Sequence, residues 1–318
     1  MIRQEFFMKF DFSIVIPTYG RPLLLEHAIN SALSQRTDIR FEIIVVDNDH
    51  DSKYESESAV RNFSDERIRY VRNPVNLGMC GNWNKCIELA NGEWLTILHD
   101  DDQLHPEYVQ KIFKHIKLNP QLSIIGCGVH EIVNAEYFSD ESHEINDCET
   151  FISLNRFDIL RCCPYYPVGL AFNKEAAKKI DGFDPGKYPS MDYDMWFRML
   201  LNYKGILLPA RLAYYRKFEN ESAKSEVLAG FLNQSYQIRK RVISTYPVPL
   251  RYFLDIYSND RVIADKKNLE KVWGIKIDAA LILNLSDMQS GFIKKMISLV
   301  VKVMVVILSG RKSYKLAN

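Results

Sequence analysis

The segment WLTILHDDD, residues 94–102, decides the fold of this chain, because an apolar run in it leads directly into three carboxylates. Residues 94–98 are short and almost wholly apolar, which is typical of a strand that is buried on both faces. His99 and three consecutive aspartates therefore follow the carboxyl end of a predicted strand. Adjacent carboxylates repel one another unless a cation or hydrogen-bond donors offset their charge, so this turn is the first candidate for a functional site.

Strand and helix patterns alternate over the first half of the chain. Apolar runs at residues 12–16, 41–46 and 68–71 predict three more buried strands, with helical spacing between them. The alternation predicts an α/β fold whose mainly parallel, mixed sheet is flanked by helices. Ligands of such sheets bind beyond the carboxyl ends of the strands, which is where Thr18 and Asp47 also lie.

The second half of the chain is mixed at first and then helical. Residues 122–127 and 168–172 predict further strands, and residues 191–201 predict a helix. We expect an α/β domain over residues 1–218 and a mainly helical extension over residues 219–318.

The composition argues against several classes of function. The 318 residues carry a formal net charge of +1, so no overall field recruits nucleic acid. None of the six cysteines forms a C-x-x-C pair, which argues against structural zinc and for reduced thiols in the cytoplasm. The N-terminal segment has no secretory leader pattern. A nicotinamide oxidoreductase is disfavoured because no G-x-G-x-x-G follows the first strand.

The carboxylates after the predicted strands suit a metal-bound nucleotide. Hard divalent cations take one or two carboxylates and complete their coordination shell with substrate phosphates. The alternative for residues 100–102 is a solvated turn that caps the helix near Pro106, although the preceding buried strand favours a site. Asp47 can accept hydrogen bonds from a nucleoside, but on its own a turn residue explains it better.

Two further carboxylates, Asp192 and Asp194, begin the predicted helix at residues 191–201. Each is either a helix cap or a candidate general base. Trp196, at helical spacing, is more typical of a core residue than of a stacking surface for a ligand.

Six segments in this order resemble the family-2 inverting glycosyltransferases of the GT-A fold: FSIVIPTYGRP, FEIIVVDND, NPVNLGMCGNWN, WLTILHDDDQLHP, DGFDP and MDYDMWFRML. The resemblance covers about residues 11–216. It implies a GT-A fold and transfer of a hexose or N-acetylhexosamine from a UDP-sugar to an acceptor hydroxyl, with inversion at the anomeric carbon. The acceptor it implies is a glycan or a lipid-linked saccharide in surface polysaccharide synthesis.

The same resemblance assigns roles to individual residues. The implied nucleotide-binding residues are Pro17, Thr18, Tyr19, Arg21, Asp47, Asn76, Gly78, Asp100 and Asp101. The implied ligands of Mn²⁺ or Mg²⁺ are Asp101 and Asp102, and the implied catalytic base is Asp192. The implied acceptor side consists of the loop at residues 165–169 with Val168 and Gly169, together with Asp194 and Trp196. Arg216 matches a position near the phosphates.

The sequence departs from the family pattern in two places. The pattern Leu-Asp-x-Asp-Asp aligns its first Asp with His99 and its metal ligand with Asp101, whereas a shift by one residue gives Asp100 and Asp102. Both registers remain open at this point. The family's Glu-Asp pair is Met191-Asp192 here, so the residue that matches the base is kept.

The C-terminal segment predicts an amphipathic basic helix near residues 292–310. Residues 288–318 contain no Asp or Glu, and their apolar stretch is too short and too charged to span a bilayer. Lys295, Ser298 and Lys302 fall on one helical stripe, which favours peripheral contact with anionic lipid at the inner face of the cytoplasmic membrane. The alternative is a helix that packs on the catalytic domain or on a second subunit.

Two rival functions share part of this chemistry. A non-catalytic nucleotide-sugar-binding module would keep Asp47 and the acidic turn but would need no base at Asp192. A glycoside hydrolase also uses paired carboxylates, but it needs no site for a metal-bound diphosphate.

Overall fold

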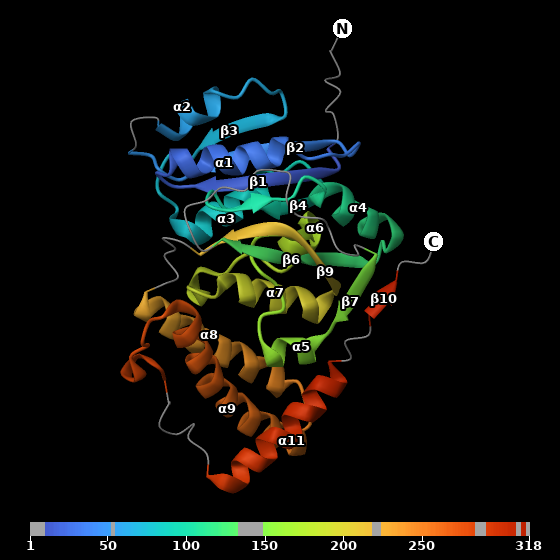
Figure 1. The fold of residues 1–318 in the computed structure, drawn as a ribbon, viewed down its shortest axis with the longest axis vertical. Coiled ribbons are helices and arrows are strands. Elements are labelled where there is room, and N and C mark those ends of the chain that lie inside the picture. The colour runs from blue at the N-terminus through green and yellow to red at the C-terminus, as the bar shows by residue number, and fades with distance from the viewer. Residues whose placement is uncertain are drawn as a thin grey trace.

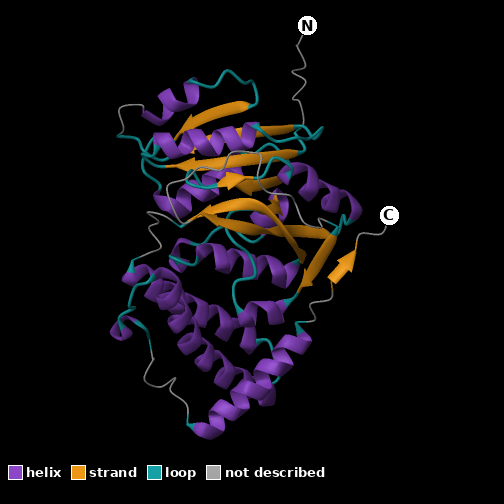
Figure 2. Ribbon diagram, viewed as in Figure 1, coloured by secondary structure: helices purple, strands orange, loops and turns teal. Residues whose placement is uncertain are grey.

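The computed structural model describes residues 10–51, 55–132, 149–217, 224–283, 291–309 and 313–315. Over these residues the strands form one ten-stranded sheet in the order β10-β7-β9-β6-β8-β4-β1-β2-β3, with β5 paired to β9. Figures 1 and 2 show this sheet with helices on both faces. The predicted α/β class with a mixed sheet is confirmed.

The first four strands form the parallel part of the sheet. They are β1 (Phe12–Thr18), β2 (Phe41–Asp47), β3 (Ile68–Arg72) and β4 (Trp94–Ile97). The helices that connect them are α1 (Pro22–Leu33), α2 (Glu55–Arg61) and α3 (Gly78–Leu89). β1 and β2 stay in register until Thr18 lies opposite Asp47. The carboxyl ends of these strands therefore meet at one edge of the sheet, as the sequence predicted.

The remaining strands are mostly antiparallel. They are β5 (Gln103–Leu104), β6 (Leu122–Ile132), β7 (Thr150–Leu154), β8 (Leu170–Asn173), β9 (Lys204–Arg216) and β10 (Ser313–Lys315). β8 joins the two parts, because it pairs antiparallel with both β4 and β6. β9 runs parallel to β6 and also pairs with β5. The pairing with β5 brings the end of β9 against the acidic turn that follows β4.

Alternate side chains of the central strands enter two different cores. Phe12, Ile14 and Ile16 of β1 pack with α1 and α4 (Tyr108–Leu118), whereas Val15 packs on the opposite face. That second face is covered by α3, α5 (Arg156–Arg161), α6 (Lys174–Lys179) and α7 (Met191–Asn202). Burial on both faces explains why these strands are unbroken apolar runs rather than alternating ones.

Three long helices follow the sheet. α8 (Ser225–Ser244) and α9 (Val248–Trp273) pack on each other, and α11 (Phe292–Leu308) packs on α9 and α5. Figure 1 shows α11 at the end of the molecule opposite β3. The predicted boundary between residues 218 and 219 lies outside the described residues, as does residue 310. Among the helices that the structure describes, none has the length and hydropathy that crossing a bilayer requires.

Cys80, Cys86 and Cys163 are free thiols, as the sequence predicted. Cys148 lies outside the described residues. Burial raises the pKa of the Cys86 thiol, so this side chain is an inert core residue at neutral pH.

Candidate active site

A cleft of ≈ 390 Å³ opens beyond the carboxyl ends of β1, β2 and β4. Most of the residues that the sequence predicted for the site line it, namely Pro17, Thr18, Tyr19, Arg21, Asn76, Gly78, Asp100, Asp101 and Asp192. They come from the end of β1 and the loop after it, from the segment between β3 and the start of α3, from the turn after β4, and from the first turn of α7. Segments far apart in the sequence thus meet in one cleft, which is the arrangement that open α/β sheets use for ligands.

The three aspartates of the acidic turn point in different directions. Asp100 turns toward β1, where it accepts a hydrogen bond from Thr18 Oγ1 at 2.8 Å. Asp101 lines the cleft and pairs with Arg21 at 2.9 Å. Asp102 turns toward β9, where its Oδ1 accepts the backbone N–H of Arg216 at 2.9 Å. The fold therefore gives different hydrogen-bond partners to three carboxylates that the sequence places side by side.

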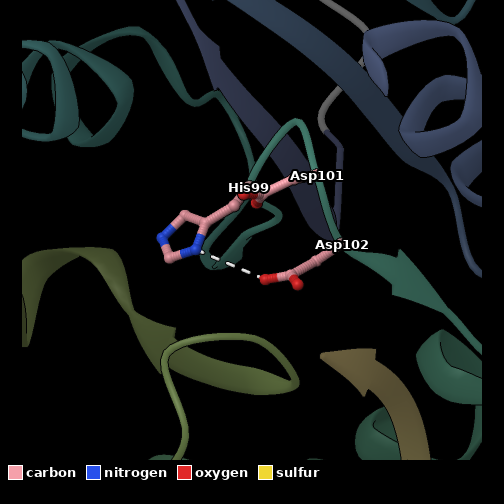
Figure 3. A group of neighbouring side chains, drawn as sticks. All are labelled: His99, Asp101 and Asp102. Carbon is pink, nitrogen blue, oxygen red and sulfur yellow. Dashed lines mark ion pairs between the residues drawn. The ribbon is translucent and has the colours of Figure 1, made fainter. Parts of the chain in front are cut away.

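One oxygen of this turn lacks a hydrogen-bond donor. Asp102 Oδ2 is buried and has no hydrogen-bond partner among the described residues. Its ion-pair contact is His99 Nδ1 at 3.4 Å, which Figure 3 marks with a dashed line. Burial raises the pKa of Asp102 to about 6, because desolvation disfavours its charged form. A buried carboxylate of this kind is suited to a cation.

His99 is held in place by an aromatic ring and a carboxylate. Its imidazole stacks on Trp83, with the ring centroids 5.0 Å apart. Burial alone would lower the pKa of His99, but the neighbouring Asp102 and the other two aspartates of the turn raise it above 6.5. One ligand atom each from His99, Asp101 and Asp102 lies within 4.8 Å of the others (Figure 3). The group has the composition and the spacing of a metal-binding site.

Asp192 lies in the first turn of α7 and lines the cleft. Its Oδ1 accepts the backbone N–H of Tyr193 at 2.7 Å, which fixes the carboxylate. Burial raises the pKa of Asp192 above 3.8, and the hydrogen bond from the Tyr193 N–H and the nearby His99 offset this rise only in part. A carboxylate with a raised pKa at the wall of a cleft has the properties of a general base.

Asp194 does not reach the cleft, in contrast to the predicted position on the acceptor side. Its side chain is 1% exposed and forms ion pairs with Arg198 of α7 and Arg241 of α8. Arg198 also donates to the carbonyl of Gly182, so the cluster ties α7 to the loop before it and to α8. Two residues along a helix rotate the side chain by about 200°, which explains why Asp192 faces the cleft and Asp194 the interior.

Three other residues predicted for the acceptor side also lie elsewhere. Trp196 is buried between Phe172 and Phe183, so it is a core residue. Val168 is fully buried, and Gly169 has φ of +76° and is packed so closely on Cys127 that a side chain would not fit. Of the predicted loop at residues 165–169, Pro167 lines the cleft.

Asp47 lies behind the cleft rather than in its lining. Its Oδ2 accepts the hydroxyl of Tyr70 at 2.6 Å, and its Oδ1 accepts the backbone N–H of Asp49 at 2.9 Å. The adjacent Asn48 lines the cleft instead. In the structure, Asp47 therefore organises the loop that presents Asn48.

A network of asparagines supports this end of the cleft, and sequence reasoning missed it. Asn48 donates to Asn76 at 2.8 Å and accepts from the Asn73 side chain at 3.0 Å. Asn73 also donates to Asn82 of α3 at 2.8 Å. The signal in the sequence was the density of asparagine after two strands, since a short amide both donates and accepts.

The helical extension also contributes to the cleft. Val227 and Phe231, four residues apart on α8, line it, as do Tyr188 and Tyr215. No motif marks the two α8 residues, because apolar side chains at helical spacing look like ordinary core positions.

The comparisons with known proteins identify the family of this chain. The model of Glycosyl transferase family 2 matches residues 13–180, which is more than half of the chain. The chain therefore belongs to glycosyl transferase family 2 and is a glycosyltransferase.

Relatives among curated proteins carry the same description. An uncharacterized glycosyltransferase of Methanocaldococcus jannaschii is 26% identical over 71% of this chain and 78% of its own length. An uncharacterized glycosyltransferase of Haemophilus influenzae is 31% identical over 59% of this chain and 61% of its own length. The GalNAc(5)-diNAcBac-PP-undecaprenol beta-1,3-glucosyltransferase of Campylobacter jejuni is 39% identical over 29% of this chain and 30% of its own length.

Solved structures share the fold. S. aureus TarS 1-349 in complex with UDP-GlcNAc matches with a TM-score of 0.56 and 17% identity, over 83% of this chain and 91% of that one. Mannosyltransferase PcManGT from Pyrobaculum calidifontis, in complex with GDP-Man and Mn²⁺, matches with a TM-score of 0.55 and 15% identity, over 94% of this chain and 86% of that one. At these identities the likeness establishes a common GT-A fold.

Proposed function

We propose that this glycosyltransferase moves a hexose or N-acetylhexosamine from a UDP-sugar to an acceptor hydroxyl, with inversion of the anomeric configuration. The observation that carries the proposal is one cleft lined by both Asp101 of the acidic turn and Asp192 of α7. A diphosphate site and a proton acceptor in the same cleft are what a single displacement at an anomeric carbon requires.

His99, Asp101 and Asp102 are the proposed ligands of Mn²⁺ or Mg²⁺. The fit rests on the buried Asp102 Oδ2, which has no hydrogen-bond partner in the described chain, and on one imidazole with two carboxylates as donors. When bound, the ion offsets the negative charge that develops on the leaving diphosphate. This assignment favours the register with His99 and Asp101, because Asp100 turns toward β1, where it accepts the Thr18 hydroxyl.

The nucleotide is proposed to lie along the loops after β1 and β3. Thr18, Asn48 and Asn76 supply hydrogen-bonding groups there. Arg21, which spans Asp100 and Asp101 in this structure, is placed to donate to the diphosphate. Uridine is proposed as the base because TarS binds UDP-GlcNAc, while the GDP-Man complex of PcManGT defines the competing donor.

Asp192 is the proposed base. As the acceptor oxygen attacks the anomeric carbon, its proton passes to the Asp192 carboxylate, and the bond between that carbon and the phosphate oxygen breaks. The backbone N–H of Tyr193 orients the carboxylate, and the raised pKa of Asp192 makes it a better proton acceptor. Attack opposite the leaving group inverts the configuration.

The acceptor is proposed to be a glycan or a lipid-linked saccharide. Tyr188, Tyr215 and Phe231 line the cleft, and such aromatic rings pack well on the apolar faces of sugars. The name of the C. jejuni relative contains an undecaprenol-linked saccharide, which supports a lipid-linked acceptor. We propose that this acceptor is met at the inner face of the cytoplasmic membrane.

A donor panel tests the proposal. Release of nucleotide diphosphate is measured with UDP-Glc, UDP-Gal, UDP-GlcNAc and GDP-Man, each with Mn²⁺ and with chelator. We expect turnover of a UDP-sugar that stops in chelator and returns with Mn²⁺ or Mg²⁺. Full activity in chelator would overturn the metal site, and turnover of GDP-Man alone would overturn uridine. Binding without any turnover would favour the non-catalytic module.

A further inference from the structure

α11 is attached to the rest of the protein by one narrow face. Val301 and Val305 are buried against the core that contains α9 and α5, and Ile297 packs beside them. Asn155, which caps α5, also donates to the carbonyls of Leu308 and Ser309 at 3.4 and 3.2 Å. The packed face and the tethered C-terminus fix which side of α11 points outward.

The outward side of α11 is apolar. Ile293 is 74% exposed, Ile307 68% and Val300 59%, and Leu299 and Val303 are more than half exposed. A surface helix of a soluble protein normally turns polar side chains to water and apolar ones to the core. α11 has apolar side chains in both directions, so its outer face is expected to have a partner.

The apolar surface continues beyond α11. A groove of ≈ 600 Å³ runs between α11 and the start of α9, and all its lining residues are apolar. Phe253 and Leu254 line it from α9, and Met296 and Met304 line it from α11. Tyr252 and Phe253 are 59% and 42% exposed at its edge. Contiguous apolar surfaces of this kind mark interaction sites.

All the charged side chains that α11 carries beside this apolar surface are positive. Lys294, Lys295 and Lys302 are exposed, and residues 288–318 contain no acid. The segment of α9 that lines the groove carries Arg251 and no carboxylate before Asp255. Ser298, which the sequence placed on the basic stripe, is buried instead. On α11 the basic flank is therefore formed by its lysines, without Ser298.

We propose that the outer face of α11 and the first turns of α9 form a membrane-docking surface that lies in the acyl-chain boundary of an anionic lipid bilayer. Apolar side chains flanked by lysines match the acyl-chain and headgroup regions of such a membrane. The lipid acyl chains would contact the apolar face, and the lipid phosphates would pair with the lysine ammonium groups. A second copy of this chain fits less well. Pairing two α11 helices through these faces would gather lysines with no α11 carboxylate between them.

Vesicle co-sedimentation of the full chain tests this surface without a sugar nucleotide, so that a failed donor proposal and a failed docking proposal are told apart. We expect binding to phosphatidylcholine vesicles that contain phosphatidylglycerol, weaker binding to phosphatidylcholine alone, and weakening in high salt. The triple variant Leu299→Gln/Val303→Gln/Ile307→Gln should bind at least about tenfold more weakly, since burying one large aliphatic side chain alone is worth about that factor.

A matched control replaces exposed apolar residues elsewhere, Leu118→Gln/Leu201→Gln/Val272→Gln. It should bind vesicles as the wild type does. Lys295→Glu/Lys302→Glu should lose the preference for phosphatidylglycerol. Equal binding by the wild type and the α11 triple variant would overturn the proposal. The proposal would also fail if the wild-type protein co-sedimented with neither kind of vesicle. A dimer in ultracentrifugation that the α11 triple variant abolishes would assign the face to a second copy.

Discussion

The cleft and the α11 surface break the ordinary rule of burial in opposite directions. In the acidic turn at the cleft, Asp100 and Asp102 are charged groups with less than a tenth of their surface exposed, and the same holds for Asp194 in the interior behind it. At α11, Ile293 and Ile307 are large apolar side chains with more than two thirds exposed. Buried charge and exposed apolar surface both cost free energy in a soluble fold, so each calls for a compensating partner.

The two regions differ in where that partner is found. Asp194 has its partners in Arg198 and Arg241 of the same chain, whereas Asp102 keeps one oxygen without a hydrogen bond in the described residues. The outer face of α11 has no covering element among the described helices. The difference separates structural residues, which are satisfied inside the fold, from those that await a ligand or a surface.

Asp192 and Asp194 show the same difference on one helix, because Asp192 faces the cleft and Asp194 has its partners inside the fold. Asp192→Asn should lower the rate of transfer by about 10²–10⁴-fold, because the proton acceptor is lost while the shape of the cleft is kept. Donor affinity, measured by calorimetry, should remain within a few-fold of wild type. An unchanged rate would reduce Asp192 to a helix cap.

Asp194→Asn should act on stability instead. Removing this carboxylate takes the ion-pair partner from Arg198 and Arg241. The free energy of unfolding should fall by about 3 kcal/mol, at the lower end for broken buried pairs because Arg241 is partly exposed. Denaturant unfolding measures the change. A stable Asp194→Asn protein with a large loss of turnover would instead return Asp194 to the catalytic site.

Asp101→Asn should weaken metal binding. Even indirect partners of a metal typically contribute 10–100-fold to affinity, so loss of a direct ligand should cost at least about tenfold. Titration of Mn²⁺ followed by its electron paramagnetic resonance signal measures the affinity without turnover. Asp184→Asn, at a half-exposed acid before α7, is the control and should bind Mn²⁺ normally. Equal affinities in all three proteins would remove Asp101 from the site.

The pH profile should show the raised pKa of Asp192. The carboxylate must be ionised to accept a proton, so kcat/KM should rise with pH through the pKa of Asp192. Because burial raises that pKa, the rise should lie above the ordinary value of 3.8. A profile that is flat down to pH 4 would show that no group with a raised pKa limits the reaction.

The smallest effect is expected at the exposed face of α11. Val305→Ala, at a side chain that is 1% exposed, should cost about 2 kcal/mol of stability, whereas Val303→Ala, at 53%, should cost less than about 0.5 kcal/mol. Thermal unfolding of the two variants in parallel measures the difference. Equal losses would mean that the outer face is packed in solution.

The sequence predicted the parts of the fold that depend on local pattern. The runs that became β1, β2 and β4 are apolar because both faces are covered, and their carboxyl ends placed Thr18 and the acidic turn on one edge. It did not predict β5, β7 or β9, whose pairings are antiparallel or distant in sequence. Their side chains mix polar and apolar residues without a period that identifies the partner strand.

The sequence identified candidate site residues where the type of side chain itself suggests a chemical role. It missed residues whose place in the cleft depends on the direction of the side chain and on tertiary packing. Both Asp192 and Asp194 were candidates because each is a carboxylate at the start of a helix. Only the phase of α7 places Asp192 at the cleft and Asp194 in the interior. Val227 and Phe231 reach the cleft from a helix that follows it in the chain by many residues. That contact depends on the docking of α8, which no local pattern encodes.

The most direct test of the account is the configuration of the first sugar released from a UDP-α-linked donor. Proton NMR during early hydrolysis, with water as acceptor and Mn²⁺ present, distinguishes the two anomers before they equilibrate. Direct displacement assisted by Asp192 predicts the β-anomer first, and neither anomer from Asp192→Asn or in chelator. Release of the α-anomer first, or the same rate from Asp192→Asn, would contradict it.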